Sequence, residues 1–103
     1  MKRIILLMTV WCFSSTAYSA RTDCPSAKVL HIQIEYRKVL YRQEGAPWRA
    51  LGLLNNDDGT RERYAALLAA QAAGRPVVIG YAIDGYDCNE TNYGTSAFLL
   101  RTH

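Results

Sequence analysis

The stretch DGTRERYAALLAAQAAGRPVVIGYAI, residues 58–83, decides the fold because it predicts one helix that leads directly into one strand. Asp58 or Thr60 can cap the start of the helix, since a side-chain oxygen there accepts a hydrogen bond from an otherwise unpaired amide. Gly74 stands where a left-handed residue often ends a helix, and Pro76 disfavours its continuation. Beyond the proline, β-branched and aromatic residues alternate with the period of a strand.

The predicted helix lacks the charged face that a helix on the side of a small domain normally turns to solvent. Residues 64–73 carry no charge, and Gln71 is their only fully polar side chain. One stripe for packing on the sheet is formed by Tyr64, Leu67, Leu68 and Ala72, and much of the remaining surface is coated by Ala66, Ala69, Ala70 and Ala73. These four alanines either form an oligomer interface or simply favour the helical state at a solvated surface.

The first 19 residues predict an export signal rather than part of the fold. A basic pair, Lys2 and Arg3, precedes an apolar run that is too short to span a bilayer comfortably. Small side chains follow, and Ser19 places the expected cleavage before Ala20. The mature protein is therefore expected to be secreted or periplasmic, with no membrane span.

The remaining residues, 20–103, predict a single small domain. Two of the twelve basic residues lie in the signal, so ten basic residues stand against nine acidic ones after cleavage, a net charge of about +1. No basic patch survives, which argues against nucleic-acid binding. Cys24 and Cys88 are the cysteines of the mature chain, and in an oxidising compartment they predict one disulfide, with two separate thiols as the alternative.

The alternation of apolar residues predicts five short strands around the helix. They cover residues 28–36, 39–43, 48–51, 77–83 and 97–101. The order β-β-β-α-β-β is that of the OB-fold, a small and partly open five-stranded barrel. We therefore expect an α+β chain that is mostly β and OB-fold-like, with a sheet carrying one helix on its face as the runner-up.

Groups that could carry a reaction are scarce, so we expect no enzyme, no cofactor and no metal. His31 falls on the polar face of a strand, and no serine has the flanking glycines of a nucleophile elbow. Two cysteines without a nearby histidine pair do not make a zinc site. The paired carboxylates lie in glycine-containing turns, which turn formation explains. An enzymatic alternative would need His31 beside Asp84 or Asp87 in a cleft.

The segment between the last two predicted strands favours binding. It mixes tyrosines with short polar side chains, and the candidate ligand-binding residues are Tyr86, Asp87, Asn89, Thr91, Asn92, Tyr93 and Thr95. Tyrosine rings offer flat apolar faces, and the neighbouring amides and hydroxyls offer directional hydrogen bonds, a combination that suits a sugar. The alternative is an ordinary loop. Trp48 with Arg49 is a second candidate patch, although a tryptophan in a short strand is more often buried.

The segment RERYAALLAAQAAGRPVVIGY, residues 61–81, resembles the B subunits of AB5 toxins, in particular the branch of subtilase cytotoxin and pertussis-like toxins. The arrangement around it, with Asp58-Gly59 before the helix and DGYDC over residues 84–88, also resembles a wider set of small secreted bacterial proteins. The resemblance covers about half of the mature chain.

The toxin resemblance implies an OB-fold subunit in a ring of five that binds a cell-surface glycan, with the helices lining a central pore. It supplies no sialic-acid pocket at residue level, and one chain does not reveal a catalytic A partner. The leading hypothesis is thus a non-enzymatic secreted or periplasmic binding protein that self-associates through its helix. The alternative is a monomeric periplasmic accessory or inhibitor protein that binds another protein.

Overall fold

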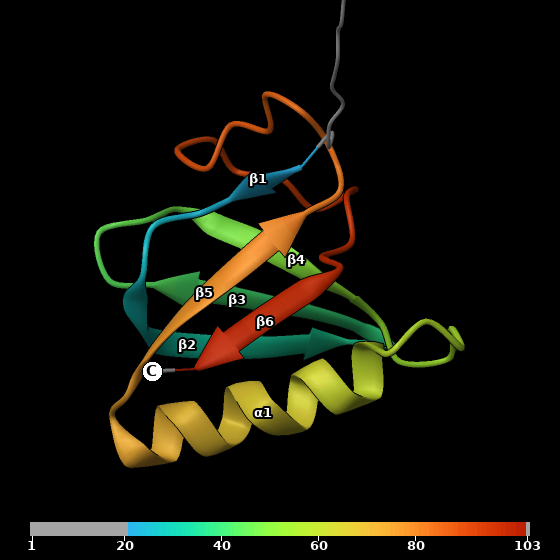
Figure 1. Cartoon of the computed structure of the whole chain (residues 1–103). Coiled ribbons are helices and arrows are strands. Elements are labelled where there is room, and N and C mark those ends of the chain that lie inside the picture. The colour runs from blue at the N-terminus through green and yellow to red at the C-terminus, as the bar shows by residue number, and fades with distance from the viewer. Residues whose placement is uncertain (1–20, 103) are drawn as a thin grey trace, which may run out of the picture.

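The computed structural model describes residues 21–102 and shows an antiparallel sheet of six strands with one helix (Figure 1). The predicted export signal and its cleavage site lie outside the described residues. The elements are β1 (Thr22–Asp23), β2 (Ala27–Glu35), β3 (Lys38–Gln43), β4 (Trp48–Leu53), α1 (Thr60–Ala73), β5 (Pro76–Tyr81) and β6 (Leu99–Thr102). The expected α+β class, mostly β, is confirmed, and β1 is an addition too short for periodicity to predict.

The sheet is built from a meander and a second group of strands that meets it over a short ladder. Strands β2, β3 and β4 pair in sequence, whereas β5 pairs with β1, β6 and the first two residues of β2. Within residues 21–102, β4 and β6 are not paired as strands, so the sheet does not close. A backbone hydrogen bond from the amide of Ala97, just before β6, to the carbonyl of Leu51 in β4 joins the two at 2.9 Å.

The helix begins and ends near the expected residues, but its N-cap residue differs from the prediction. Gly59 is the cap residue, with a left-handed φ of 88°, and Thr60 is the fully buried first residue of the helix. The Asp58 carboxylate accepts hydrogen bonds from both the amide and the hydroxyl of Thr60. Gly74 ends the helix with a φ of 66°, as predicted, because a left-handed residue there satisfies the last carbonyl groups.

The helix packs on the sheet through a narrower stripe than the sequence suggests. Leu67 and Ala70 are buried, and Tyr64 is half-buried against the core, but Leu68 and Ala72 are exposed. The expected stripe of four residues is therefore wrong at two positions. Figure 1 shows α1 at one end of the sheet and the loop between β5 and β6 at the other. Only one side of the helix therefore faces the strands.

Strand β2 does not follow the simple alternation predicted for it. The pairing with β3 shifts between Val29 and His31, where one extra residue forms a bulge. Val29 is buried, whereas Leu30 and Ile34 are exposed. Tyr36, predicted as the last residue of this strand, lies in the turn after β2.

Candidate functional site

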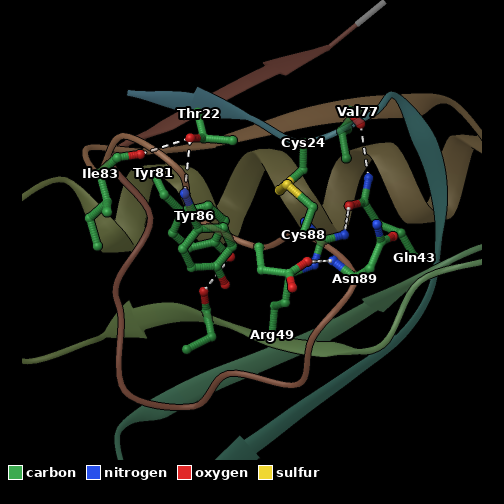
Figure 2. The surroundings of a disulfide bond; sticks show 12 residues. Thr22, Cys24, Gln43, Arg49, Val77, Tyr81, Ile83, Tyr86, Cys88 and Asn89 are labelled. Carbon is green, nitrogen blue, oxygen red and sulfur yellow. Dashed lines mark hydrogen bonds between the residues drawn. A yellow bond between two sulfur atoms is a disulfide. The ribbon is translucent and has the colours of Figure 1, made fainter. Parts of the chain in front are cut away.

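The loop between β5 and β6 is anchored by the predicted disulfide. Cys24 and Cys88 are joined with an S–S distance of 2.01 Å, and Cys24 is buried in the core (Figure 2). This bond ties the loop to the residue that follows β1. The disulfide prediction is confirmed, and the bond is compatible with a periplasmic or extracellular protein.

Thr22 forms a second attachment for the start of the same loop. Its hydroxyl donates a hydrogen bond to the carbonyl of Ile83 at 2.8 Å and accepts one from the amide of Tyr86 at 3.2 Å (Figure 2). Thr22 of β1 and Cys24, the residue after it, thus hold the first half of the loop.

Tyr86, a predicted ligand-binding residue, is part of the protein core. Only 8% of it is exposed, and its ring is stacked on that of Tyr81 with 3.8 Å between the ring centres (Figure 2). Burial raises the pKa of Tyr86, partly offset by the neighbouring Tyr81 hydroxyl and the Arg49 charge. Tyr86 offers no free face to a ligand, so its assignment to a surface site is wrong.

A cluster of buried polar side chains lies beneath this stack. The hydroxyls of Tyr41 and Tyr81 are 2.7 Å apart, and that of Tyr81 donates to the carbonyl of Ala50. Arg49 is only 1% exposed, and its guanidinium donates to the side-chain oxygen of Gln43 at 2.8 Å. Within residues 21–102, no carboxylate pairs with Arg49. The suggested surface patch of Trp48 and Arg49 is therefore wrong for Arg49.

Several polar residues of the loop hold its backbone rather than face outward as a group. The Asn92 side-chain oxygen accepts hydrogen bonds from the amides of Gly94 and Thr95, both at 3.0 Å. Its backbone pairs alongside β4, since the Ala50 amide donates to the Asn92 carbonyl. Asp87 accepts from the amide of Asn89 in the same way. These hydrogen bonds form two turns within the loop and hold its second half beside β4.

Tyr93 is the predicted residue that the structure places at a hollow. Tyr93 is 46% exposed and lines this hollow together with residues of β3 and β4. The hollow has a volume of about 150 Å³ and is lined by Lys38, Ala50, Gly52, Leu53, Tyr93, Gly94 and Ser96. Of the other loop candidates, Asn89 and Thr91 are exposed outside this hollow and Thr95 is half-buried. The predicted set of seven residues is thus not one site.

The other residues that line the Tyr93 hollow were not predicted as site residues. Lys38 falls between two predicted strands, 28–36 and 39–43, and Ser96 lies just before the last one. Both reach the hollow because β3, β4 and the loop lie side by side, which depends on the register Lys38↔Leu53 and on the pairing of the loop with β4. No local signal in the sequence specifies that arrangement.

A second hollow runs along the helix. It has a volume of about 540 Å³ and is lined by Ala66, Ala69, Ala70, Ala73, Arg75 and Thr102. Ala69 and Ala73 are exposed and Ala66 is half-buried, but Ala70 is buried against the sheet. Three of the four predicted interface alanines therefore reach the surface, and Ala70 contributes to the floor of the groove.

The histidine and the carboxylates of the enzymatic alternative lie in separate surroundings. His31 is stacked on Trp48 with 6.0 Å between the ring centres, and the Asp87 carboxylate holds a turn of the loop. Within residues 21–102, no cluster of three or more His, Cys, Asp or Glu side chains could hold a metal ion. The helix of this region is neither long nor apolar enough to cross a membrane.

Comparison of the chain with protein-family models, with curated proteins and with solved structures yields no match. The geometry of the described residues therefore carries the functional argument.

Proposed function

We propose that the chain is an exported, non-enzymatic binding protein that holds a glycan in the Tyr93 hollow. The observation that carries this proposal is the half-exposed ring of Tyr93 at a hollow whose walls are fixed by β3, β4 and a disulfide-anchored loop. An accessible tyrosine on an anchored loop is suited to recognition, because little backbone conformational entropy is lost on binding.

The chemistry of the hollow suits a sugar ring. The Tyr93 ring offers an apolar face for C–H groups, and the Lys38 ammonium and the Ser96 hydroxyl offer hydrogen bonds to sugar hydroxyls. The lining also includes Ala50, whose small side chain keeps this part of the hollow shallow and apolar. A mixture of one aromatic wall with a few polar groups is typical of small-ligand sites.

The arrangement of the strands supports an OB-like barrel as the framework of this binding protein. The meander of β2, β3 and β4, the helix, and the pairing of β5 with both β2 and β6 follow the expected order. From the resemblance to AB5 toxin B subunits, we also propose that the chain self-associates into a ring of five subunits. The uncharged part of α1, residues 64–73, exposes Ala69 and Ala73 along the groove, and this supports a contact there.

A glycan array followed by titration tests the ligand class. We expect Tyr93→Ala to weaken binding of the strongest array hit by about tenfold or more, the scale of one lost aromatic contact. Thr91→Ala, in the same loop but outside the hollow, is the matched control and should bind as the wild type does. An array without hits, or equal binding by wild type and Tyr93→Ala, would contradict a glycan site at Tyr93.

Sedimentation of the mature protein at micromolar concentration tests assembly. We expect an oligomer that Ala69→Arg dissociates, because a second positive charge would be buried in the groove that Arg75 also lines. Ala65→Arg, at an exposed alanine outside the groove, is the matched control. Ala70 is unsuited to this test because it lies in the core. A monomeric wild type would instead favour an accessory or inhibitor protein that acts alone.

A further inference from the structure

Tyr36, at the tip of the β2–β3 hairpin, combines two features that folding alone does not explain. Its side chain is fully exposed, and its backbone adopts a positive φ of 57°. Among residues 21–102, it is the only residue other than glycine with a positive φ.

The left-handed conformation is unfavourable for a residue with a bulky side chain, and glycine or asparagine usually occupies such turn positions. A tyrosine here therefore costs free energy, and its exposed ring recovers none by burial. Residues held in unfavourable conformations are found disproportionately at sites of recognition. Tyr36 thus points to a contact outside the molecule.

The tip that carries Tyr36 is held firmly. Glu35 and Lys38 pair across the end of the hairpin, and the carbonyl of Arg37 accepts a hydrogen bond from the amide of Leu54 at 2.7 Å. The turn is therefore fixed both to its own strands and to the residue after β4. An aromatic ring on such a fixed turn loses little backbone entropy when it binds a ligand.

A hollow of about 300 Å³ lies beside this tyrosine. It is lined by Glu35, Tyr36, Arg37, Lys38, Leu53 and Asn55. Lys38 and Leu53, which face each other across β3 and β4, also line the Tyr93 hollow. The two hollows are therefore neighbours that have these two residues in common. Each also has its own exposed tyrosine.

We propose that the two hollows form one groove for an oligosaccharide of at least two sugar units. Tyr93 packs against one ring and Tyr36 against another, and Lys38 donates hydrogen bonds where the two units join. This inference rests on the proposed glycan-binding function. The Tyr93 hollow alone is smaller than the roughly 300–1,000 Å³ of ordinary ligand sites, whereas the two hollows together fall within that range.

Titration of two probes separates the groove from the single hollow. The probes are the tetrasaccharide that binds most strongly on a glycan array and the monosaccharide unit of it that binds best alone. We expect Tyr36→Ala to weaken the tetrasaccharide by about tenfold and to leave the monosaccharide unchanged, while Tyr93→Ala weakens both. Leu30→Ala, an exposed apolar residue of β2 outside both hollows, is the control.

A second variant separates a loss of affinity from a loss of folding stability. Tyr36→Gly removes the ring and relieves the positive φ, so it should raise the urea midpoint of unfolding while losing the same affinity for the tetrasaccharide. Tyr36→Phe should retain that affinity.

Three results would overturn the groove. If Tyr36→Ala binds the tetrasaccharide as tightly as wild type while Tyr93→Ala does not, the extension to Tyr36 is wrong and the Tyr93 hollow stands. If neither variant is weakened, both proposals fail. If Tyr36→Ala instead abolishes capture of a protein and no glycan binds, the hairpin tip is a protein contact.

Discussion

The two halves of the loop between β5 and β6 have similar compositions and opposite environments. The first half places Tyr86 in the core against Tyr81 and joins Cys88 to Cys24. The second half pairs beside β4 and leaves Tyr93 half-exposed over a hollow. The first half therefore serves to anchor the loop, and the second half can serve to bind.

The difference arises from the partners that each half meets rather than from its own residues. A tyrosine followed by small polar residues occurs in both halves. The first is drawn inward because the disulfide and the Thr22 hydroxyl bring its backbone onto β1 and β5. The second remains outside because Asn92 turns the chain along the edge of β4. Variants that remove an anchor should separate these roles.

The largest effect is expected from removal of the disulfide. The bond joins residues separated by 64 positions, and the chain-entropy model gives about 4 kcal/mol for a loop of that length. Cys24→Ala combined with Cys88→Ala should lower the free energy of unfolding by about that amount, as measured by urea titration. The same double variant should lose glycan binding, because the loop that carries Tyr93 is released at its first half.

Reduction of the wild type provides the control, since it breaks the bond without changing a residue. Wild type under reducing conditions and the double variant should unfold at similar urea concentrations. A double variant that is as stable as the oxidised wild type would show that packing of Tyr86 alone anchors the loop.

The second largest effect is expected from a direct comparison of the two loop tyrosines. Tyr86→Ala removes a stacked, buried ring and should cost about 3 kcal/mol of stability, whereas Tyr93→Ala, at a half-exposed position, should cost about 0.5 kcal/mol or less. Urea unfolding of the two variants measures both values. Equal losses at the two positions would contradict the division of the loop into an anchoring half and a binding half.

The elements of the fold that could be predicted are those with strong local signals. The helix from Thr60 to Ala73 and its left-handed end at Gly74 follow from propensity and from the glycine–proline pair. The disulfide follows from the count of two cysteines after the signal. The extra residue in β2 at Val29 could not be predicted, because a bulge is set by the partner strand and leaves no distinct local pattern.

The candidate site could be predicted only to the level of its loop. Tyr93 was among the seven residues named, but the sequence cannot distinguish it from Tyr86, which pairs with a distant tyrosine in the core. Arg49 is a comparable case, since a charged residue next to a tryptophan suggests a surface and not a fully buried position. Burial of such residues depends on long-range pairing of β3, β4 and the loop.

The third prediction concerns alkaline pH and again distinguishes buried tyrosines from exposed ones. Burial raises the pKa of Tyr41, Tyr81 and Tyr86 above the value of about 10 that tyrosine has in an unfolded chain. Above pH of about 10, the unfolded chain releases these protons while the folded chain keeps them, so stability falls as pH rises. Each such tyrosine contributes a slope of up to about 1.4 kcal/mol per pH unit.

Urea unfolding across this pH range measures the slope. Tyr41→Phe should reduce it by the contribution of one tyrosine, whatever its effect on stability at neutral pH. An unchanged slope in this variant would mean that Tyr41 ionises equally in both states and that its burial does not govern the alkaline response.

The smallest effect is expected from Arg49→Met, although the Arg49 side chain is fully buried. Removal of a buried charge that no carboxylate pairs recovers the free energy that its removal from water costs. This gain offsets the loss of two contacts. One is the hydrogen bond to Gln43, and the other is the contact with the Tyr41 ring, whose centre is 5.4 Å from the guanidinium. Arg49→Met, which keeps much of the volume, should therefore change stability by less than about 1 kcal/mol. Arg49→Ala should cost about 3 kcal/mol, because it leaves a cavity beneath the loop. Equal losses of stability in urea by the two variants would mean that the guanidinium itself stabilises the anchoring half of the loop. The volume of the Arg49 side chain would then not be the cause.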